Sequence, residues 1–222
     1  LLVAFIAPAF TSGAISSERE QQTFDLLRTT LLPTRLFVFG KLLSGMLYVL
    51  ILLLAAVPLQ SIAFFFGGVE ETELILSFVI LTATALLFGA MGLYFSARSE
   101  RTLSANVLTY AATMFVMFGI PIVWGAVMLI VGFSFDRVEA STVQLALLYI
   151  SGLILSTNPA ITAGLTQYFL INRRTVGLFS YTLANGDTVT LVSPWIPFTI
   201  IYVVLSVVFF VLAVRRVSML DR

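Results

Sequence analysis

The sequence predicts an all-α integral membrane protein, a polytopic helical bundle that forms a single transmembrane domain over residues 1–222. Two observations predict this class. Hydrophobic residues make up 59% of the chain and charged residues only 10%, whereas soluble domains carry about 25% charged residues. Several apolar stretches also reach the ~20 residues that a helix needs to cross a bilayer.

The first element is an apolar stretch over 1–15, which is shorter than a complete span. It begins with Leu1 rather than Met, and it lacks the basic segment that opens a signal peptide. We interpret 1–15 as the end of a span and expect the sequence to be a fragment that lacks the start of that span.

The longest polar run follows, and 16–41 is expected to be a cytoplasmic segment. Ser17 and Glu20 have the spacing of a capping box, which predicts the start of an amphipathic helix over 18–30 at the membrane surface. Pro33 ends this helix because the residue before a proline disfavours helical geometry. The apolar stripe of the helix consists of Phe24, Leu27 and Leu31.

Four complete spans are expected after this segment, at 42–66, 74–97, 103–133 and 195–214. The second of them carries small residues at helical spacing, which gives one face that another helix can approach closely. Pro121 is expected to kink the third span. The small residues are Ala85, Gly89, Gly92 and Ser96.

The stretch 143–171 is apolar but interrupted at Asn158 and Pro159, which predicts either a kinked span or a re-entrant pair of helices. In the loop 172–194, two runs of alternating polar and apolar residues flank Asn185-Gly186. This pattern predicts a small β-hairpin outside the bilayer.

The distribution of basic residues predicts the orientation. The segment 16–41 carries four Lys and Arg residues and the loop 67–73 carries none, so the positive-inside rule places 16–41 in the cytoplasm. The break at Asn158-Pro159 favours the re-entrant interpretation, which leaves 172–194 and its hairpin extracellular and the C-terminus cytoplasmic.

Several kinds of chemistry are missing from the sequence. It contains no Cys and no His, and the cores of the expected spans contain no Asp, Glu, Lys or Arg. Such charges usually mark an ion path or a proton relay. Gly40-Lys41 does not continue into a phosphate-binding loop, since Arg35 and Leu42 stand where glycine and Ser or Thr are needed. We therefore expect no cofactor, no metal, no nucleic acid and no catalytic site.

The motif around the polar segment resembles the permease subunits of type-2 ATP-binding-cassette (ABC) exporters. The matching residues are Ser12–Glu20, Thr23–Leu27, Pro33–Arg35 and Gly40–Leu42. The resemblance implies the type-2 ABC transporter fold, in which this segment is the coupling helix that docks on the ATPase subunit. It also implies two ATPase subunits, a second permease copy or homologue, and a multi-pass location in a prokaryotic plasma (inner) membrane.

The resemblance also assigns the coupling residues. Glu18, Arg19 and Glu20 would face the ATPase or lock the start of the helix, and Phe24, Leu26 and Leu27 would pack against the spans or the partner's groove. The whole expected set is Ser17, Glu18, Arg19, Glu20, Thr23, Phe24, Asp25, Leu26, Leu27 and Arg28. Pro121 and Pro159 are expected to act as structural kinks, and the small residues of 74–97 as helix-packing positions.

A second hypothesis stays open. Spans without charge also suit a channel or a membrane assembly protein that uses no ATP, in which the 16–35 helix would lie on lipid headgroups. An enzyme fits poorly, because no set of nucleophile, base and orienting residue is visible.

Overall fold

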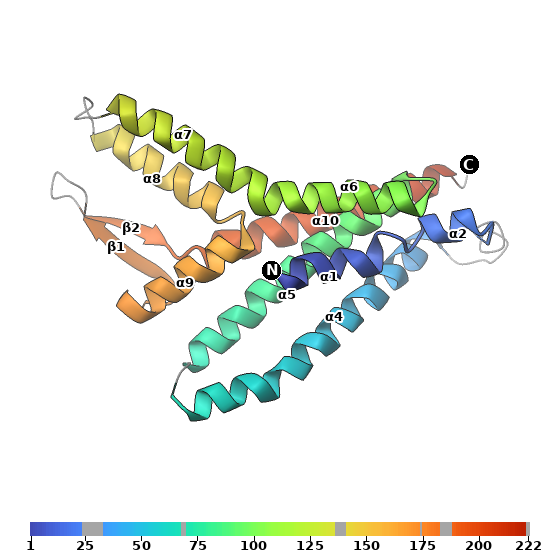
Figure 1. Cartoon of the computed structure of the whole chain (residues 1–222), viewed down its shortest axis with the longest axis horizontal. Coiled ribbons are helices and arrows are strands. Elements are labelled where there is room, and N and C mark those ends of the chain that lie inside the picture. The colour runs from blue at the N-terminus through green and yellow to red at the C-terminus, as the bar shows by residue number, and fades with distance from the viewer. Residues whose placement is uncertain (24–32, 68–69, 136–140, 174, 183–187, 221–222) are drawn as a thin grey trace. The chain divides into compact units, whose positions relative to one another are not determined.

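The computed structural model describes residues 1–23, 33–67, 70–135, 141–173, 175–182 and 188–220 (Figure 1). Most of these residues are helical. The helices are α1 (Leu2–Thr11), α2 (Ser16–Glu20), α4 (Thr34–Phe65), α5 (Glu71–Arg98), α6 (Thr102–Met114), the π-helix η1 (Phe115–Gly119), α7 (Ile120–Phe135), α8 (Ser141–Leu155), α9 (Pro159–Arg173) and α10 (Trp195–Leu220). The strands are β1 (Leu178–Thr182) and β2 (Thr188–Val192).

Four of the described helical stretches are long and apolar enough to cross a membrane: Thr34–Ile62, Glu71–Arg98, Thr102–Ile130 and Trp195–Met219. A fifth candidate is the pair formed by α8 and α9, whose axes bend by 118° at a short break. By helix length and hydropathy the protein is therefore a candidate multi-pass membrane protein, as the composition predicts.

The contacts divide the chain into two units. The first contains Leu1–Glu70, Leu81–Thr113 and Tyr202–Arg222, and the second contains Glu71–Ile80 and Met114–Ile201. Helices α5 and α10 each contribute residues to both units. Each of their residues therefore belongs to the unit in which its own part of the helix lies.

The first unit is organised around the buried part of α5. In the most apolar window of α5, 56% of the residues are buried, compared with 22% in α4 and in α10. A small-residue face brings α1 close to α4 and α5. A Cβ added at Gly92 would lie 2.4 Å from Thr11 Oγ1, and one added at Gly45 would lie 2.7 Å from Thr11 Cγ2. Thr11 therefore occupies space that only glycine on the facing helices leaves open.

A hydrophobic cluster joins the start of α2 to three long helices. Ile15 is fully buried there with Val38 of α4. The other buried members are Leu93 and Ala97 of α5, and Ala213 and Val217 of α10. Because the residue before α2 is part of this core, α2 cannot move away from these helices without exposing apolar surface.

In the second unit, Pro121 follows the π-helix η1. A proline has no N–H, so the carbonyl four residues earlier, at Met117, loses its helical partner. Asn158 Nδ2 donates to that carbonyl oxygen at 2.6 Å. A π-helical segment thus lies directly before Pro121, the residue at which the sequence predicts a kink.

Asn158 also begins α9. Its Oδ1 accepts hydrogen bonds from the amides of Ala160 (2.9 Å) and Ile161 (3.1 Å), and Pro159 is the first helical residue. Proline is well suited to this position because its missing N–H would lack a partner in any case. Pro159, which the sequence predicts to be a kink, therefore starts a new helix.

The hairpin pairs β1 with β2 in antiparallel register, from Leu178↔Val192 to Thr182↔Thr188. The predicted hairpin is confirmed, while the turn at Asn185-Gly186 lies outside the described residues. Two hydrogen bonds fix the open end of the hairpin. Ser193 N donates to Gly177 O (2.8 Å), and Trp195 Nε1 donates to Val176 O (2.7 Å).

We predict that Gly92→Ala lowers the free energy of unfolding by about 1–3 kcal/mol, because the added methyl group overlaps Thr11. The control is Gly40→Ala in α4, where an added Cβ meets nothing within 4 Å and alanine favours the helix by about 0.5–1 kcal/mol. Thermal unfolding in detergent measures both. Equal stability of the two variants would contradict the close approach of α1.

The two functions of Asn158 can be separated. Asn158→Ser keeps a capping oxygen but cannot reach Met117, so it should cost about 1–3 kcal/mol. Asn158→Ala also removes the cap and should cost about 1 kcal/mol more. Asn172→Ala, which removes a bond within one helix, is the control. If all three variants unfold at one temperature, Asn158 does not link η1 to α9.

Candidate functional site

The candidate site is the polar junction where α2 meets the long helices of the first unit. The amides of Ile15 and Ser16 donate to Ser96 Oγ of α5, at 2.9 and 3.0 Å. The Ser96 hydroxyl in turn donates to Ser16 Oγ at 3.2 Å, and its residue is fully buried. Because the first amides of a helix have no partner within it, Ser96 caps α2 from a neighbouring helix.

The predicted capping box is therefore wrong. The N-cap of α2 is Ile15, without any side-chain cap, and Ser17 lies inside the helix. The physical reason is that the helical turn begins before Ser17, whose amide donates to the carbonyl oxygen of Gly13 at 3.0 Å and so has no need of the Glu20 carboxylate. The carboxylate of Glu20 does not turn back to the cap but accepts a hydrogen bond from Thr102 Oγ1.

A salt bridge joins α2 to α4. Lys41 Nζ lies against Glu18 Oε1, and the Glu18 side chain is only 19% exposed. The other carboxylate oxygen of Glu18 is buried and has no hydrogen-bond partner among the described residues. In this position Glu18 fastens α2 to α4.

Arg19 holds α2 against the end of α5, where its Nη1 lies 3.5 Å from the carbonyl oxygen of Ser99. Partial burial lowers the pKa of the Arg19 guanidinium. The positive charge of Arg216 lowers this pKa further, and the negative charge of Glu100 raises it. Arg216 of α10 therefore lies close enough to Arg19 of α2 for its positive charge to act on the Arg19 guanidinium.

Polar contacts also join this segment to α6. Ser12 Oγ lies 2.7 Å from Asn106 Oδ1, and Ser16 Oγ lies 3.5 Å from Thr102 Oγ1. Together with the bond from Thr102 to Glu20, these contacts connect the junction to the first two turns of α6. The junction is thus attached to α4, α5, α6 and α10 at once.

The other end of α2 is closed by a left-handed turn. Gln22 has a φ of +56°, and its amide donates to the carbonyl of Arg19. The amide of Thr23 donates to the carbonyl of Glu18 at 3.0 Å. These two bonds form the Schellman motif that ends many helices.

The prediction of one continuous helix over 18–30 is therefore wrong at Gln21–Gln22. Glutamine is a good helix former, so Gln21 and Gln22 carry no signal in the sequence that a helix ends there. The left-handed conformation that ends the helix is usually adopted by glycine. Part of the predicted site lies outside the described residues: Phe24, Asp25, Leu26, Leu27 and Arg28.

The exposed part of the described junction is small and polar. It consists of Glu20, Gln21, Gln22 and Thr23, all of which are exposed. These side chains offer one carboxylate and several amide and hydroxyl groups for hydrogen bonds to a partner. Within the described ranges, no three His, Cys, Asp or Glu side chains come together as metal ligands would.

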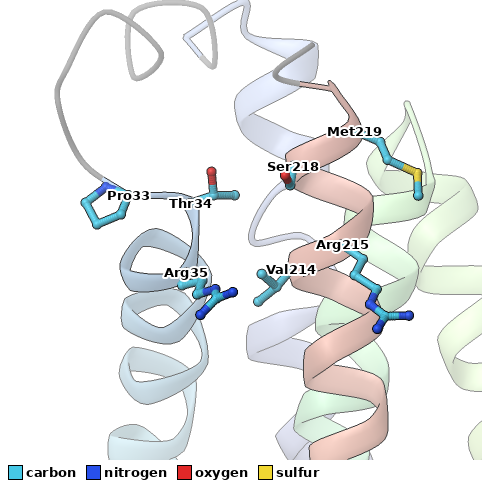
Figure 2. A pocket seen from close by; sticks show the side chains of 7 residues that line it. All are labelled: Pro33, Thr34, Arg35, Val214, Arg215, Ser218 and Met219. Atoms are coloured by element: carbon cyan, nitrogen blue, oxygen red, sulfur yellow. The ribbon is translucent and has the colours of Figure 1, made fainter.

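Beside the junction, a hollow of about 520 Å³ lies between the start of α4 and the end of α10 (Figure 2). Arg35 extends from the first turn of α4, and Arg215 lies on the last turns of α10. Both arginines are exposed, and no described acidic residue pairs with either of them. The hollow therefore carries positive charge at the end of two apolar helices.

The small residues of α5 lie inside the first unit. Ala85, Gly89, Gly92 and Ser96 are all buried. Gly89 faces Met46 of α4, and Gly92 faces Thr11 and Ser12. The sequence pattern singled out Ser96 for its size alone. It gave no sign that the hydroxyl binds two amides, or that Thr102 and Asn106 take part in the junction.

Comparison with protein-family models and with curated proteins gave no match. What the sequence and the structure establish together is a helical protein with four or five candidate membrane spans and a polar junction fastened to them.

We predict that Ser96→Ala destabilises the protein by about 1–3 kcal/mol for each amide left unpaired. The matched control is Ser77→Ala in the same helix, since the Ser77 hydroxyl bonds only to its own helix, at Leu74 O (2.8 Å). Chemical or thermal unfolding in detergent compares the two. A Ser96→Ala variant as stable as Ser77→Ala would show that Ser96 does not hold the start of α2.

Proposed function

We propose that the chain is the permease subunit of a type-2 ABC exporter and that the α2 junction transmits force from a separate ATPase subunit. The observation that carries the proposal is the attachment of α2: its first amides bind Ser96, and Ile15 is buried among α4, α5 and α10. The motif over 12–42 supports it, because in that family the same segment docks on the ATPase.

In the proposed mechanism, two ATPase subunits bind below two permease copies, or below one copy and a homologue. The exposed turn from Glu20 to Thr23 is the described part of the docking surface. ATP binding closes the ATPase pair and displaces α2. Because Glu18 is bridged to Lys41 and Ser96 binds the amides of Ile15 and Ser16, the displacement passes directly to α4 and α5.

The subunit itself is proposed to be non-catalytic, with hydrolysis confined to the ATPase. Its translocation path would lie between the two permease copies, in a prokaryotic plasma (inner) membrane. Membrane lipid would contact the exposed apolar side chains of α4 and α10, such as Ile51, Leu54, Ile200 and Val204.

The proposed orientation places α2 in the cytoplasm and the β-hairpin outside the cell, with α8 and α9 as a re-entrant pair. The 118° bend supports it, because the chain turns back by more than a right angle between the two helices. Cysteines introduced at Ser180 and Ser218 test this in a chain that has no cysteine of its own. Ser180 is expected to react with a reagent added outside and Ser218 only after permeabilisation; the reverse pattern would contradict the orientation.

One observation favours the second candidate function. Arg35 and Arg215 beside the hollow could bind the phosphates of anionic lipid headgroups, as expected if the junction of a channel or assembly protein lay on the membrane surface. In that case the exposed turn of α2 would contact lipid and no ATPase would be retained.

Co-purification tests the docking surface. Glu20→Arg is expected to reduce the amount of retained ATPase about tenfold, since a reversed charge in a contact costs on the order of 1.4 kcal/mol or more. Glu100→Arg is the matched control, because Glu100 is also an exposed glutamate next to the junction. Thr102→Val removes the hydrogen bond to Glu20 without changing charge and should retain the ATPase.

Each outcome decides between the two functions. Loss of the ATPase in Glu20→Arg alone supports docking at α2. A parent chain that retains no ATPase would contradict the permease proposal. Equal retention by Glu20→Arg and the parent chain would contradict docking at α2, and equal loss in Glu20→Arg and Glu100→Arg would show a general charge effect rather than a docking surface.

A further inference from the structure

A second cavity, of about 550 Å³, lies within the second unit, enclosed by α8, α9, the β-hairpin and the start of α10. Its size falls within the range of about 300–1,000 Å³ that ligand pockets occupy in proteins. Its walls include Leu148 and Gly152 of α8, Leu165 and Phe169 of α9, and Phe179 and Leu191 of the hairpin. Nothing in the proposed coupling mechanism uses this cavity.

The lining offers almost only apolar contacts. None of its residues is Asp, Glu, Lys or Arg. The hydroxyls of Ser151 and Ser156 donate to carbonyls of their own helix, Leu147 O (2.5 Å) and Gly152 O (2.6 Å). Tyr149 donates to Thr190 O at 3.2 Å. A charged or strongly polar ligand would lose its hydration here without compensation, whereas a hydrocarbon would not.

Contacts between the walls form the cavity in advance. The rings of Phe169 and Phe179 stack with centroids 4.1 Å apart, which holds the hairpin against α9. Trp195 fixes the base of the hairpin to α10 through its bond to Val176 O. Asn158 sets the start of α9, so the two helices that form one side cannot collapse together without breaking these bonds.

The cavity is continuous with the exposed apolar surface. Leu153 and Tyr168 both line it, and their side chains are 55% and 58% exposed. Tyr168 thus combines a wall position with an exposed side chain, whose hydroxyl can donate a hydrogen bond to an oxygen of a bound molecule. In a protein with four candidate membrane spans, the most abundant apolar molecule is bilayer lipid.

We propose that this cavity binds one acyl chain of a bilayer phospholipid, with the Tyr168 hydroxyl near the ester oxygens. The volume suits a single chain, and the uncharged walls exclude the headgroup. This site goes beyond the proposed transport function and does not depend on an ATPase partner.

The test uses the full chain in phosphatidylcholine vesicles that contain a phosphatidylcholine with a photoreactive diazirine in its acyl chain. Crosslinked peptides are identified by mass spectrometry. The parent chain is expected to carry adducts on peptides from α8, α9 and the hairpin, and an excess of unreactive phosphatidylcholine added during reconstitution should reduce them to the level of general surface labelling.

Two glycines give a matched pair of variants. Gly152 lines the cavity, Gly164 does not, and a Cβ added at either position meets nothing within 4 Å. Gly152→Phe would occupy the space of several methylene groups and should reduce these adducts about tenfold or more. Gly164→Phe should leave them unchanged. Gly152→Leu serves if Gly152→Phe does not elute as a single species.

The outcomes are decisive in both directions. Loss of the adducts in the Gly152 variants alone supports the site. Labelling of Gly152→Phe or Gly152→Leu equal to that of the parent overturns it, as does equal loss in Gly164→Phe, or labelling of α8 and α9 that unreactive lipid does not reduce. A cavity filled by a second copy of this chain would be closed to the lipid probe, so the peptides of α8, α9 and the hairpin would carry no adducts above general surface labelling, which also overturns it.

Discussion

The hydroxyl of Ser96 is the contact on which the candidate site depends. It accepts the amides of Ile15 and Ser16 and donates to Ser16, so a single buried oxygen satisfies the start of α2 from the side of α5. An isolated helix of five residues would not be stable in water. The short helix persists because its first amides, its Glu18 carboxylate and the apolar Ile15 beside it are all held by other helices.

In the proposed mechanism, the energy comes from a separate subunit, and this attachment allows a small polar segment to pass the resulting force on to the long helices. Buried hydrogen bonds and an ion pair of low exposure resist displacement more than surface contacts do. A force applied at the exposed turn from Glu20 to Thr23 would therefore move the ends of α4 and α5 together with α2. The left-handed Gln22 adds a local conformation that a glutamine adopts only at some cost.

The sequence predicted the features that follow from composition and local pattern. The length of the apolar stretches predicted the candidate spans. The alternation of polar and apolar residues on either side of Asn185-Gly186 predicted the hairpin, and Asn158-Pro159 predicted the break between α8 and α9. It did not predict contacts made between distant segments. Ser17 and Glu20 have the spacing of a capping box, yet α2 begins one residue before Ser17, and Ser96 of α5, eighty residues from Ser16, binds the amides of Ile15 and Ser16. The end of α2 at Gln22 was equally hidden, because glutamine carries no stop signal.

The central claim is that α2 and the helices of the first unit form one rigid body. Spin labels on cysteines introduced at Gln21 and Leu103, both exposed, measure the distance between α2 and α6 in the cysteine-free chain. Pulsed electron–electron double resonance of the reconstituted protein should give one narrow distribution of distances between the two labels. The Ser96→Ala variant should give a broad one. A broad distribution in the parent chain, or a narrow one unchanged by Ser96→Ala, would contradict the claim.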